Sequence, residues 1–391
     1  MYKSWWECEV SAATHSGCQA LVDLITKPSD SAVELHATLL TSGHLVYIHY
    51  FRAVAILQIL VLHACRVFML RGFDEQVPPS NRFLIVNDIL FHDTTMYLAI
   101  ISGIIYSTRL SKRPTFLFYK QRFLRVVVPY IVMSMLFSTL LFFRWNGVEG
   151  IHDLIALTKF LSYNVLWGEA QNTYWYIPVV VLLYALSPIL HRLLTTAARY
   201  PMLIAAVTLP LFFSRTGTDV TIATCIFFTG TYVIGLYMGE DVEGRLGAIA
   251  RYLPLLGVVA AITTALLWFL YTHGIDKWGP TSLRESVHFV QKLALGALIL
   301  IWLWRRCKDL PLVVARTLDL VALSAFGLYL LHGFVFRICL RIASAVVASP
   351  DSTWNLIGGG AIIFCLGLLS CLVIIFLLRV LLGKHSRLLV G

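Results

Sequence analysis

The stretch FRAVAILQILVLHACRVFML, residues 51–70, is apolar enough to cross a membrane, yet it carries Arg52 and His63. Placing a charged side chain near the centre of a bilayer costs at least ~2.5 kcal/mol, so ionisable residues at such positions indicate a functional site. An α-helix rises ~1.5 Å per residue, which puts His63 ~16 Å deeper than Arg52. One end of this helix can meet a charged ligand while the deeper position carries out chemistry.

The composition of the whole chain is that of a membrane protein. Of its 391 residues, 58% are hydrophobic and 13% are charged, which is too apolar for a fold in water. The sequence predicts an all-α polytopic membrane protein of about ten transmembrane helices, the fifth interrupted by Pro201 and Pro210. The expected spans fall at roughly 50–70, 83–106, 123–143, 173–193, 197–214, 219–239, 252–271, 287–304, 319–345 and 355–381.

Residues 1–44 differ from the rest of the chain. They are mixed in character and contain several acidic residues, unlike a signal peptide with its basic start and apolar middle. We interpret them as a cytoplasmic N-terminal extension ahead of a membrane domain at 45–391. A misassigned start codon is the alternative interpretation.

The distribution of Lys and Arg predicts the orientation, because cytoplasmic loops carry the excess of these residues. Basic residues are concentrated after the second and eighth expected helices, so both loops should be cytoplasmic: Arg109, Lys112, Arg113, Lys120 and Arg122, then Arg305, Arg306, Lys308 and Arg316. The acidic loop at 240–243 does not support this orientation. An even number of helices then places both termini in the cytoplasm, with the protein in the cell (inner) membrane.

Charge and cysteine content exclude other classes of protein. The net charge of +10 reflects membrane topology, and a nucleic-acid-binding function would need a basic soluble domain, which is missing. The eight Cys are scattered, most of them within the expected spans, without a CxxC pair or a metal-ligand spacing. Neither a disulfide framework nor a metal site is expected.

Several motifs occur in an order that resembles the acyltransferase 3 family of integral membrane acyltransferases. Arg52 and His63 match the Arg and His of that family's first helix, and Ser102–Gly103 in MYLAIISGIIY match a small-residue turn that ends its second. The sequence YKQRFLRVVVPY supplies an RxxR pair, Arg122 and Arg125, ahead of a proline. Two later stretches, YWYIPVVVLLYALSP and LSAFGLYLLH, also match, so the resemblance spans about residues 47–380. The chain departs from the family at Asp93, where relatives carry a small or polar residue.

The resemblance implies that residues 45–391 form a membrane acyltransferase domain. Such a domain would transfer an acyl group, most likely acetyl, from cytoplasmic acyl-CoA to a hydroxyl of a cell-envelope or exported saccharide. Succinyl transfer is an alternative that the sequence leaves open. No tightly bound cofactor is expected; acyl-CoA is a donor substrate, and the saccharide acceptor and the lipid bilayer are the other partners.

Cations at the cytoplasmic side suit a donor that carries phosphates. Arg122 and Arg125 are expected one turn apart at the start of the third helix, where they and Arg52 can bind CoA phosphate oxygens. Simple anchoring of that helix by positive charge is the alternative role for the pair.

His63 is the candidate catalytic base, which would remove the proton from the acceptor hydroxyl as it attacks the thioester. A covalent acyl-histidine and a purely structural histidine remain alternatives. A carboxylate often orients a catalytic histidine, and Asp88 and Asp93 are expected at a similar depth. His332 is also expected at this depth, and His332, Trp175 and Tyr176 are candidates for substrate binding. A structural role is the alternative for His332, and a place at the membrane interface would explain the two aromatic residues equally.

A saccharide or lipid transporter, or a flippase, is the competing function for a chain of ten membrane helices. In that case Arg52 and His63 would bind substrate or relay protons. Such folds usually contain internal repeats with interrupted helices at matching positions. The second half of this sequence has no counterpart to the motifs of the first, which favours the enzyme.

Overall fold

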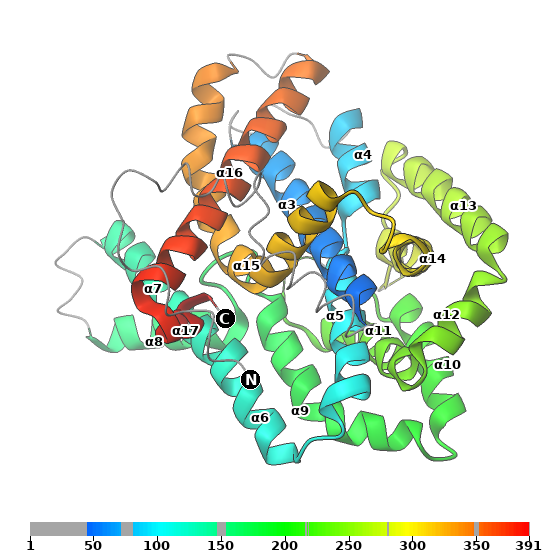
Figure 1. Ribbon diagram of the computed structural model, residues 1–391. Helices are drawn as coiled ribbons and strands as arrows, with labels where there is room; N and C mark the ends of the chain where they lie inside the picture. Colours follow the sequence, from blue (N-terminus) through cyan, green and yellow to red (C-terminus); the bar gives the residue numbers. More distant parts are fainter. Residues whose placement is uncertain are drawn as a thin grey trace.

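The computed structural model describes residues 45–71, 81–146, 154–215, 217, 219–279, 281–347 and 352–390. Within these residues the chain is helical apart from turns and a small antiparallel pair, β1 (Lys277–Trp278) and β2 (Thr281–Ser282). The predicted all-α membrane fold is confirmed (Figure 1). The N-terminal extension expected at residues 1–44 lies outside the described residues.

Nine helical segments in the described part of the chain are long and apolar enough to cross a membrane. Two of them combine several consecutive helices, and seven are single helices. The segments are α3 (Val46–Arg71); α4 (Arg82–Phe91) with α5 (Thr95–Ile105) and η1 (Tyr106–Leu110); α6 (Thr115–Arg122) with η2 (Phe123–Val127) and α7 (Val128–Asn146); α9 (Tyr176–Leu194); α11 (Ile222–Glu240); α13 (Leu253–Thr272); α14 (Leu283–Arg306); α15 (Leu312–Val346); and α16 (Thr353–Leu382).

The fifth expected span, at 197–214, forms the shorter helix α10 (Arg199–Phe212) of 14 residues. Pro201 lies in its first turn, where a missing backbone N–H costs little, and Pro210 lies near its end. The sequence interpretation missed α8 (Leu154–Trp167), α12 (Val242–Ala250) and α17 (Arg387–Val390). These helices are shorter than a bilayer-spanning helix, so a search for apolar runs of spanning length passes over them.

The second expected span is not continuous. The prediction of one helix over 83–106 is wrong in this respect, because α4 ends at Phe91 and α5 begins at Thr95. Asp93 between them has φ +61°, the only positive value for a non-glycine residue in the described ranges. The buried Lys292 of α14 compensates for the break, since its Nζ donates to the carbonyl oxygens of Ile89 at 2.7 Å and Leu90 at 3.1 Å. These carbonyls lie at the end of α4, where the last turn leaves acceptors unpaired.

The third expected span begins earlier than predicted, at Thr115, and contains a π-helical turn, η2. Arg122 is the last residue of α6 and Arg125 lies within the π turn. A π turn contains more residues than an α turn, so side chains three positions apart do not share a face. The expected common face is therefore not formed: Arg122 is half-buried and Arg125 is exposed.

Helix α3 is central to the packing, because it contacts α4, α5, α14, α15 and α16. Helix α5 packs closely along α11, where a Cβ on Gly103 would lie 2.7 Å from the backbone nitrogen of Leu236. The C-terminal α17 packs on α7 and η2 (Figure 1). Because α3 contacts five other helices, it lies at the centre of the bundle with its Arg52 and His63.

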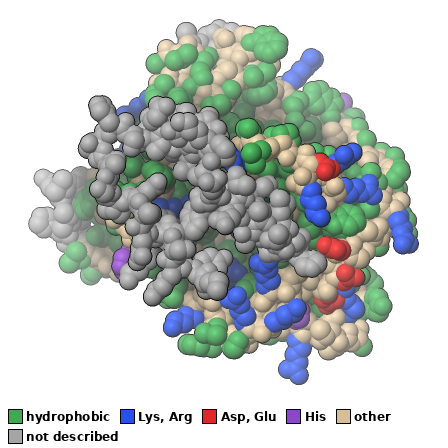
Figure 2. Space-filling view, viewed as in Figure 1, with side chains coloured by type: hydrophobic (Ala, Val, Ile, Leu, Met, Phe, Trp, Pro, Cys, Tyr) green, Lys and Arg blue, Asp and Glu red, His purple; other side chains and the backbone are tan. Residues whose placement is uncertain are grey.

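In Figure 2 many Lys and Arg side chains lie on the lower half and right edge of the face seen in Figure 1, among hydrophobic side chains.

Candidate active site

Polar side chains gather around α3 at two depths. Near its start, a pocket of about 210 Å³ is lined by residues from α3, η1 and α15 and the segments beside them: Leu45, Val46, Ile48, His49, Arg52, Ile105, Arg109 and Asp319. Arg52 and Arg109 give this pocket two guanidinium groups. His63 lies eleven residues further along α3, which corresponds to ~16 Å of helix.

The structure brings Arg122 to the same end of the bundle as Arg52. The guanidinium carbon of Arg122 lies 4.9 Å from the centre of the Tyr184 ring and 5.8 Å from that of Phe118. Arg122 and Tyr184 both interact electrostatically with Arg52, and Arg122 Nε is buried without a hydrogen-bond partner among the described residues. Arg125 is exposed, and its charged neighbours are Arg387, Arg122 and Arg113. Only Arg52 and Arg122 of the predicted donor-binding residues are therefore partly enclosed.

His63 and His332 lie side by side deeper in the bundle, with ring centres 5.2 Å apart. His332 is fully buried, and its Nδ1 is 3.0 Å from the carbonyl oxygen of Leu328. A carbonyl oxygen only accepts, so Nδ1 carries the hydrogen and a neutral ring presents a lone pair at Nε2. That Nε2 is buried and has no hydrogen-bond partner in the described part of the chain. The arrangement leaves an acceptor beside His63.

Asp88 and Asp93 each bond an arginine instead of His63. The Asp88 carboxylate accepts from Arg66 at 3.0 Å, and Asp93 Oδ1 accepts from Nε of Arg215 at 2.8 Å. In the described ranges neither carboxylate contacts His63, so the direct carboxylate partner expected for the histidine is not formed. The two arginines are electrostatic neighbours of His63.

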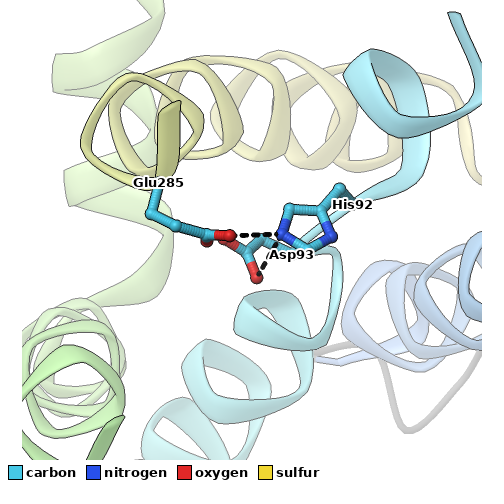
Figure 3. Close-up of side chains that lie close together, drawn as sticks. All are labelled: His92, Asp93 and Glu285. Atoms are coloured by element: carbon cyan, nitrogen blue, oxygen red, sulfur yellow. Dashed lines mark hydrogen bonds and ion pairs between the residues drawn. The ribbon is translucent and has the colours of Figure 1, made fainter. Parts of the chain in front are cut away.

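The break between α4 and α5 is held by a buried ionic network (Figure 3). His92 Nε2 lies 2.8 Å from Glu285 of α14 and 3.7 Å from Asp93. One ligand atom from each of these three residues falls within 4.8 Å of the others, a spacing that a divalent cation can use. Arg215 already supplies positive charge there, since its Nε is 2.8 Å from Asp93 and 3.7 Å from Glu285. We interpret the group as an ion-pair network that fixes the break.

Arg215 is a site residue that the sequence interpretation missed. It is buried, its guanidinium lies 4.5 Å from the centre of the Trp175 ring, and its NH1 is buried without a partner among the described residues. It also interacts electrostatically with His63. The available signal was a lone arginine in the apolar stretch PLFFSRTG, but the residue falls just outside an expected span.

Trp175 and Tyr176, the predicted acceptor-binding aromatics, are both buried at the start of α9. Trp175 offers its ring to Arg215, which orients that guanidinium. Tyr176 packs against Phe228 and Tyr329, with ring centres 5.2 and 6.2 Å away, and its hydroxyl has no partner in the described part of the chain. Tyr176 therefore remains able to donate to a ligand.

Replacing Lys292 with Met is expected to lower the thermal unfolding midpoint of the purified protein. The substitution removes the donor to the Ile89 and Leu90 carbonyls, and each buried group left unpaired costs about 1–3 kcal/mol. Lys277→Met, at an exposed position in β1, is the control and should leave the midpoint unchanged. Equal midpoints for the two variants would show that Lys292 does not support the helix break.

Comparison with known families identifies the fold that carries this site. Residues 45–379 match the family model described as the acyltransferase domain of acyltransferase 3 proteins. The chain belongs to the acyltransferase 3 family. It is therefore a multi-pass membrane O-acyltransferase, as the motifs around Arg52, His63 and Arg122 predict.

Curated relatives of this acyltransferase 3 protein occur in Staphylococcus aureus. Two of them, from strains Mu50 and MRSA252, are each named "Probable poly-beta-1,6-N-acetyl-D-glucosamine export protein". They are 21% and 22% identical to this chain over 306 residues, which is 73% of this chain and 81% of each relative. No solved structure matches the chain.

Proposed function

We propose that this acyltransferase moves an acetyl group from cytoplasmic acetyl-CoA to a hydroxyl of a cell-envelope or exported saccharide. The observation that carries the proposal is the pairing, along one helix, of a cationic pocket at Arg52 with a buried pair of histidines at His63 and His332. The proposed orientation places the Arg52 pocket in the cytoplasm, with the protein in the cell (inner) membrane. Both termini are cytoplasmic if the shorter helix α10 crosses the membrane in addition to the nine long segments.

The cationic end suits a donor that carries phosphates. Arg52 and Arg109 line the pocket, and Arg122 lies close by with a buried Nε that has no hydrogen-bond partner among the described residues. Guanidinium groups bind phosphate oxygens through short, charge-assisted hydrogen bonds. A phosphate group near Arg52 and a thioester near His63 would be separated by ~16 Å, the length that an extended pantetheine arm must cover.

The histidine end suits proton transfer from the acceptor. The acceptor oxygen attacks the carbonyl carbon of the thioester while His63 takes the hydroxyl proton. The carbon–sulfur bond then breaks, and the proton passes from His63 to the CoA thiolate. Negative charge develops on the carbonyl oxygen in the intermediate. NH1 of Arg215, a buried donor without a partner in the described part of the chain, can stabilise that charge.

The acceptor proposal draws on the staphylococcal relatives, whose names refer to poly-β-1,6-N-acetyl-D-glucosamine. We therefore propose oligosaccharides of β-1,6-linked N-acetylglucosamine as the first acceptors to examine. Their free hydroxyls provide the nucleophile that the mechanism needs.

Export of such a saccharide without acyl transfer is the second candidate function. The names of the relatives favour export, and so does the interruption at Asp93, because interrupted membrane helices with buried charges are typical of transporters. A transporter does not need acetyl-CoA, so the donor reaction separates the two functions.

The test is an incubation of the purified protein with acetyl-CoA labelled in its acetyl group and a β-1,6-linked N-acetylglucosamine pentasaccharide. The proposal expects label in the saccharide and release of free CoA. An unlabelled saccharide and intact acetyl-CoA, with saccharide transport across membrane vesicles retained, would instead establish the export function.

Arg122→Gln is expected to raise the apparent KM for acetyl-CoA by about tenfold, while the acceptor KM stays near its wild-type value. Loss of one charge-assisted hydrogen bond costs about 1.5–3 kcal/mol, which is tenfold or more in binding. Arg125→Gln is the matched control, since it removes the same charge from an exposed position on the same segment. If Arg122→Gln and Arg125→Gln change the KM for acetyl-CoA and the KM for the acceptor to the same extent, the arginines anchor the helix and do not bind CoA.

A further inference from the structure

Three buried side chains, His332 beside His63 and two from the turn ahead of α9, carry polar atoms that find no partner among the described residues. Gln171 is 3% exposed, Thr173 is 7% exposed and His332 is fully buried. The atoms concerned are Nε2 and Oε1 of Gln171, Oγ1 of Thr173 and Nε2 of His332. Each buried polar group left unpaired costs about 1–3 kcal/mol, so a cluster of them indicates a place where a ligand or water completes the bonds.

The geometry of the cluster is fixed by the turn between α8 and α9. Tyr174 of this turn donates to the carbonyl oxygen of Leu330 at 2.6 Å, and Tyr329 of α15 donates to the carbonyl oxygen of Thr173. These bonds hold the turn against the stretch of α15 that contains His332. The unpaired atoms therefore belong to an ordered, doubly anchored turn.

Gly333 shows how closely the turn approaches α15. A Cβ at this position would collide with Oε1 of Gln171 and would lie 3.0 Å from Oγ1 of Thr173. The unpaired amide and hydroxyl groups are thus directed at the residue next to His332. Any side chain larger than glycine would displace the Gln171 amide.

The chemistry of the unpaired atoms selects a class of ligand. The Gln171 amide offers both a donor and an acceptor, the Thr173 hydroxyl can do either, and Nε2 of His332 accepts. A phosphate needs donors only, and a cation needs acceptors only. A mixed set of hydrogen-bond donors and acceptors suits hydroxyl groups, because each hydroxyl can donate and accept at the same time.

Aromatic rings complete the surroundings of the cluster. Tyr329 lies beside the cluster, and its ring centre is 5.7 Å from that of His332 and 6.2 Å from that of Tyr176. Small-molecule sites are mostly apolar and aromatic, with a few polar groups that set orientation, and a sugar ring has apolar C–H faces as well as hydroxyls. Tyr176 adds a further unpaired hydroxyl.

We propose that Gln171, Thr173 and Nε2 of His332, with Gly333 leaving room for the Gln171 amide, form a binding site for the hydroxyl groups of a saccharide acceptor. The site presents one acceptor hydroxyl to His63, whose ring lies 5.2 Å from that of His332. This inference rests on the proposed function for the identity of the acceptor, and it adds the residues that bind it.

Binding of the β-1,6-linked N-acetylglucosamine pentasaccharide, measured by calorimetry on the full-length protein in detergent, tests the site. Gln171→Met and Thr173→Val keep the side-chain size and remove the unpaired atoms. Each should weaken the Kd about tenfold, because one ligand hydrogen bond is lost, while the thermal midpoint without ligand stays the same or rises. Unchanged Kd values, or no binding to the wild-type protein, would overturn the proposal.

Two further variants separate ligand binding from structure. Gly333→Ala should also weaken saccharide binding, because the added Cβ meets the Gln171 amide. Asn164→Leu is the control for a polar group that already has a partner, since Asn164 donates to Ser138 at 3.0 Å. It should lower the thermal midpoint and leave the Kd unchanged. If the Gln171 and Thr173 variants behave like Asn164→Leu, the cluster is structural.

Failure of the site and failure of the proposed function give different results. Saccharide binding that depends on Gln171 and Thr173, without any acetyl transfer, would retain the site and reject the transferase reaction on this acceptor. Acetyl transfer whose acceptor KM is unaffected by these substitutions would retain the function and reject the site.

Discussion

His63→Ala is expected to reduce acetyl transfer at least ~100-fold, the usual effect of removing a general base, while membrane insertion and the thermal midpoint are retained. His63 lies beside His332 at the centre of the bundle, and Arg66 and Arg215 are its charged neighbours. The measurement is the rate of label transfer from acetyl-CoA under saturating substrates.

His273→Ala provides the control for loss of an imidazole, because His273 is exposed at the end of α13 and should be dispensable. Near-normal turnover of the His63 variant would rule out His63 as the base. His332, whose Nε2 also has a free lone pair, would then be the residue to examine.

Arg215→Met should abolish measurable transfer and also destabilise the protein, because it leaves the buried carboxylate of Asp93 without its partner. Removing one member of a buried ion pair typically costs about 3–5 kcal/mol. The same change removes the proposed donor to the thioester oxygen, and loss of one such donor costs about 100- to 1000-fold in rate. The measurements are the thermal midpoint and the turnover rate.

The double variant Asp93→Asn with Arg215→Met separates these two effects. It removes both charges, so the thermal midpoint should recover toward that of the wild-type protein. Transfer should stay low, because NH1 of Arg215 is still missing. Recovery of transfer together with stability would show that Arg215 only holds the helix break and does not act on the substrate.

The features predicted from the sequence were those that depend on neighbouring residues. The apolar runs gave the membrane helices, and the spacing of Arg52 and His63 on one helix gave the two depths of the site. The family resemblance, which rests on local motifs, was confirmed over residues 45–379. Each of these signals is contained within a single helix or a short motif.

The features that were not predicted depend on residues far apart in the chain. Arg215 bonds Asp93 across 122 positions, and Lys292 supports the end of α4 across 203 positions. Arg215 neutralises the Asp93 carboxylate at the break, and Lys292 bonds the freed carbonyls of Ile89 and Leu90. A hydropathy pattern describes one segment at a time, so it extends the helix through residue 93.

The polar turn between α8 and α9 illustrates the same limit. In sequence, Gln171 lies just ahead of the expected span at 173–193 and looks like a loop residue, and Thr173 is the first residue of that span. Their burial follows from the bonds that Tyr174 and Tyr329 make between the turn and α15. The contact of this turn with α15, and hence the site inferred there, required the three-dimensional structure.

The most direct test of the account uses sealed membrane vesicles of known orientation that contain the protein. Labelled acetyl-CoA is added outside either inside-out or right-side-out vesicles, and the β-1,6-linked N-acetylglucosamine pentasaccharide is enclosed within them. Labelled saccharide is expected only in inside-out vesicles, where the Arg52 pocket faces the donor. His63→Ala should abolish this product. Labelling only in right-side-out vesicles, or labelling that is unaffected by His63→Ala, would contradict the account.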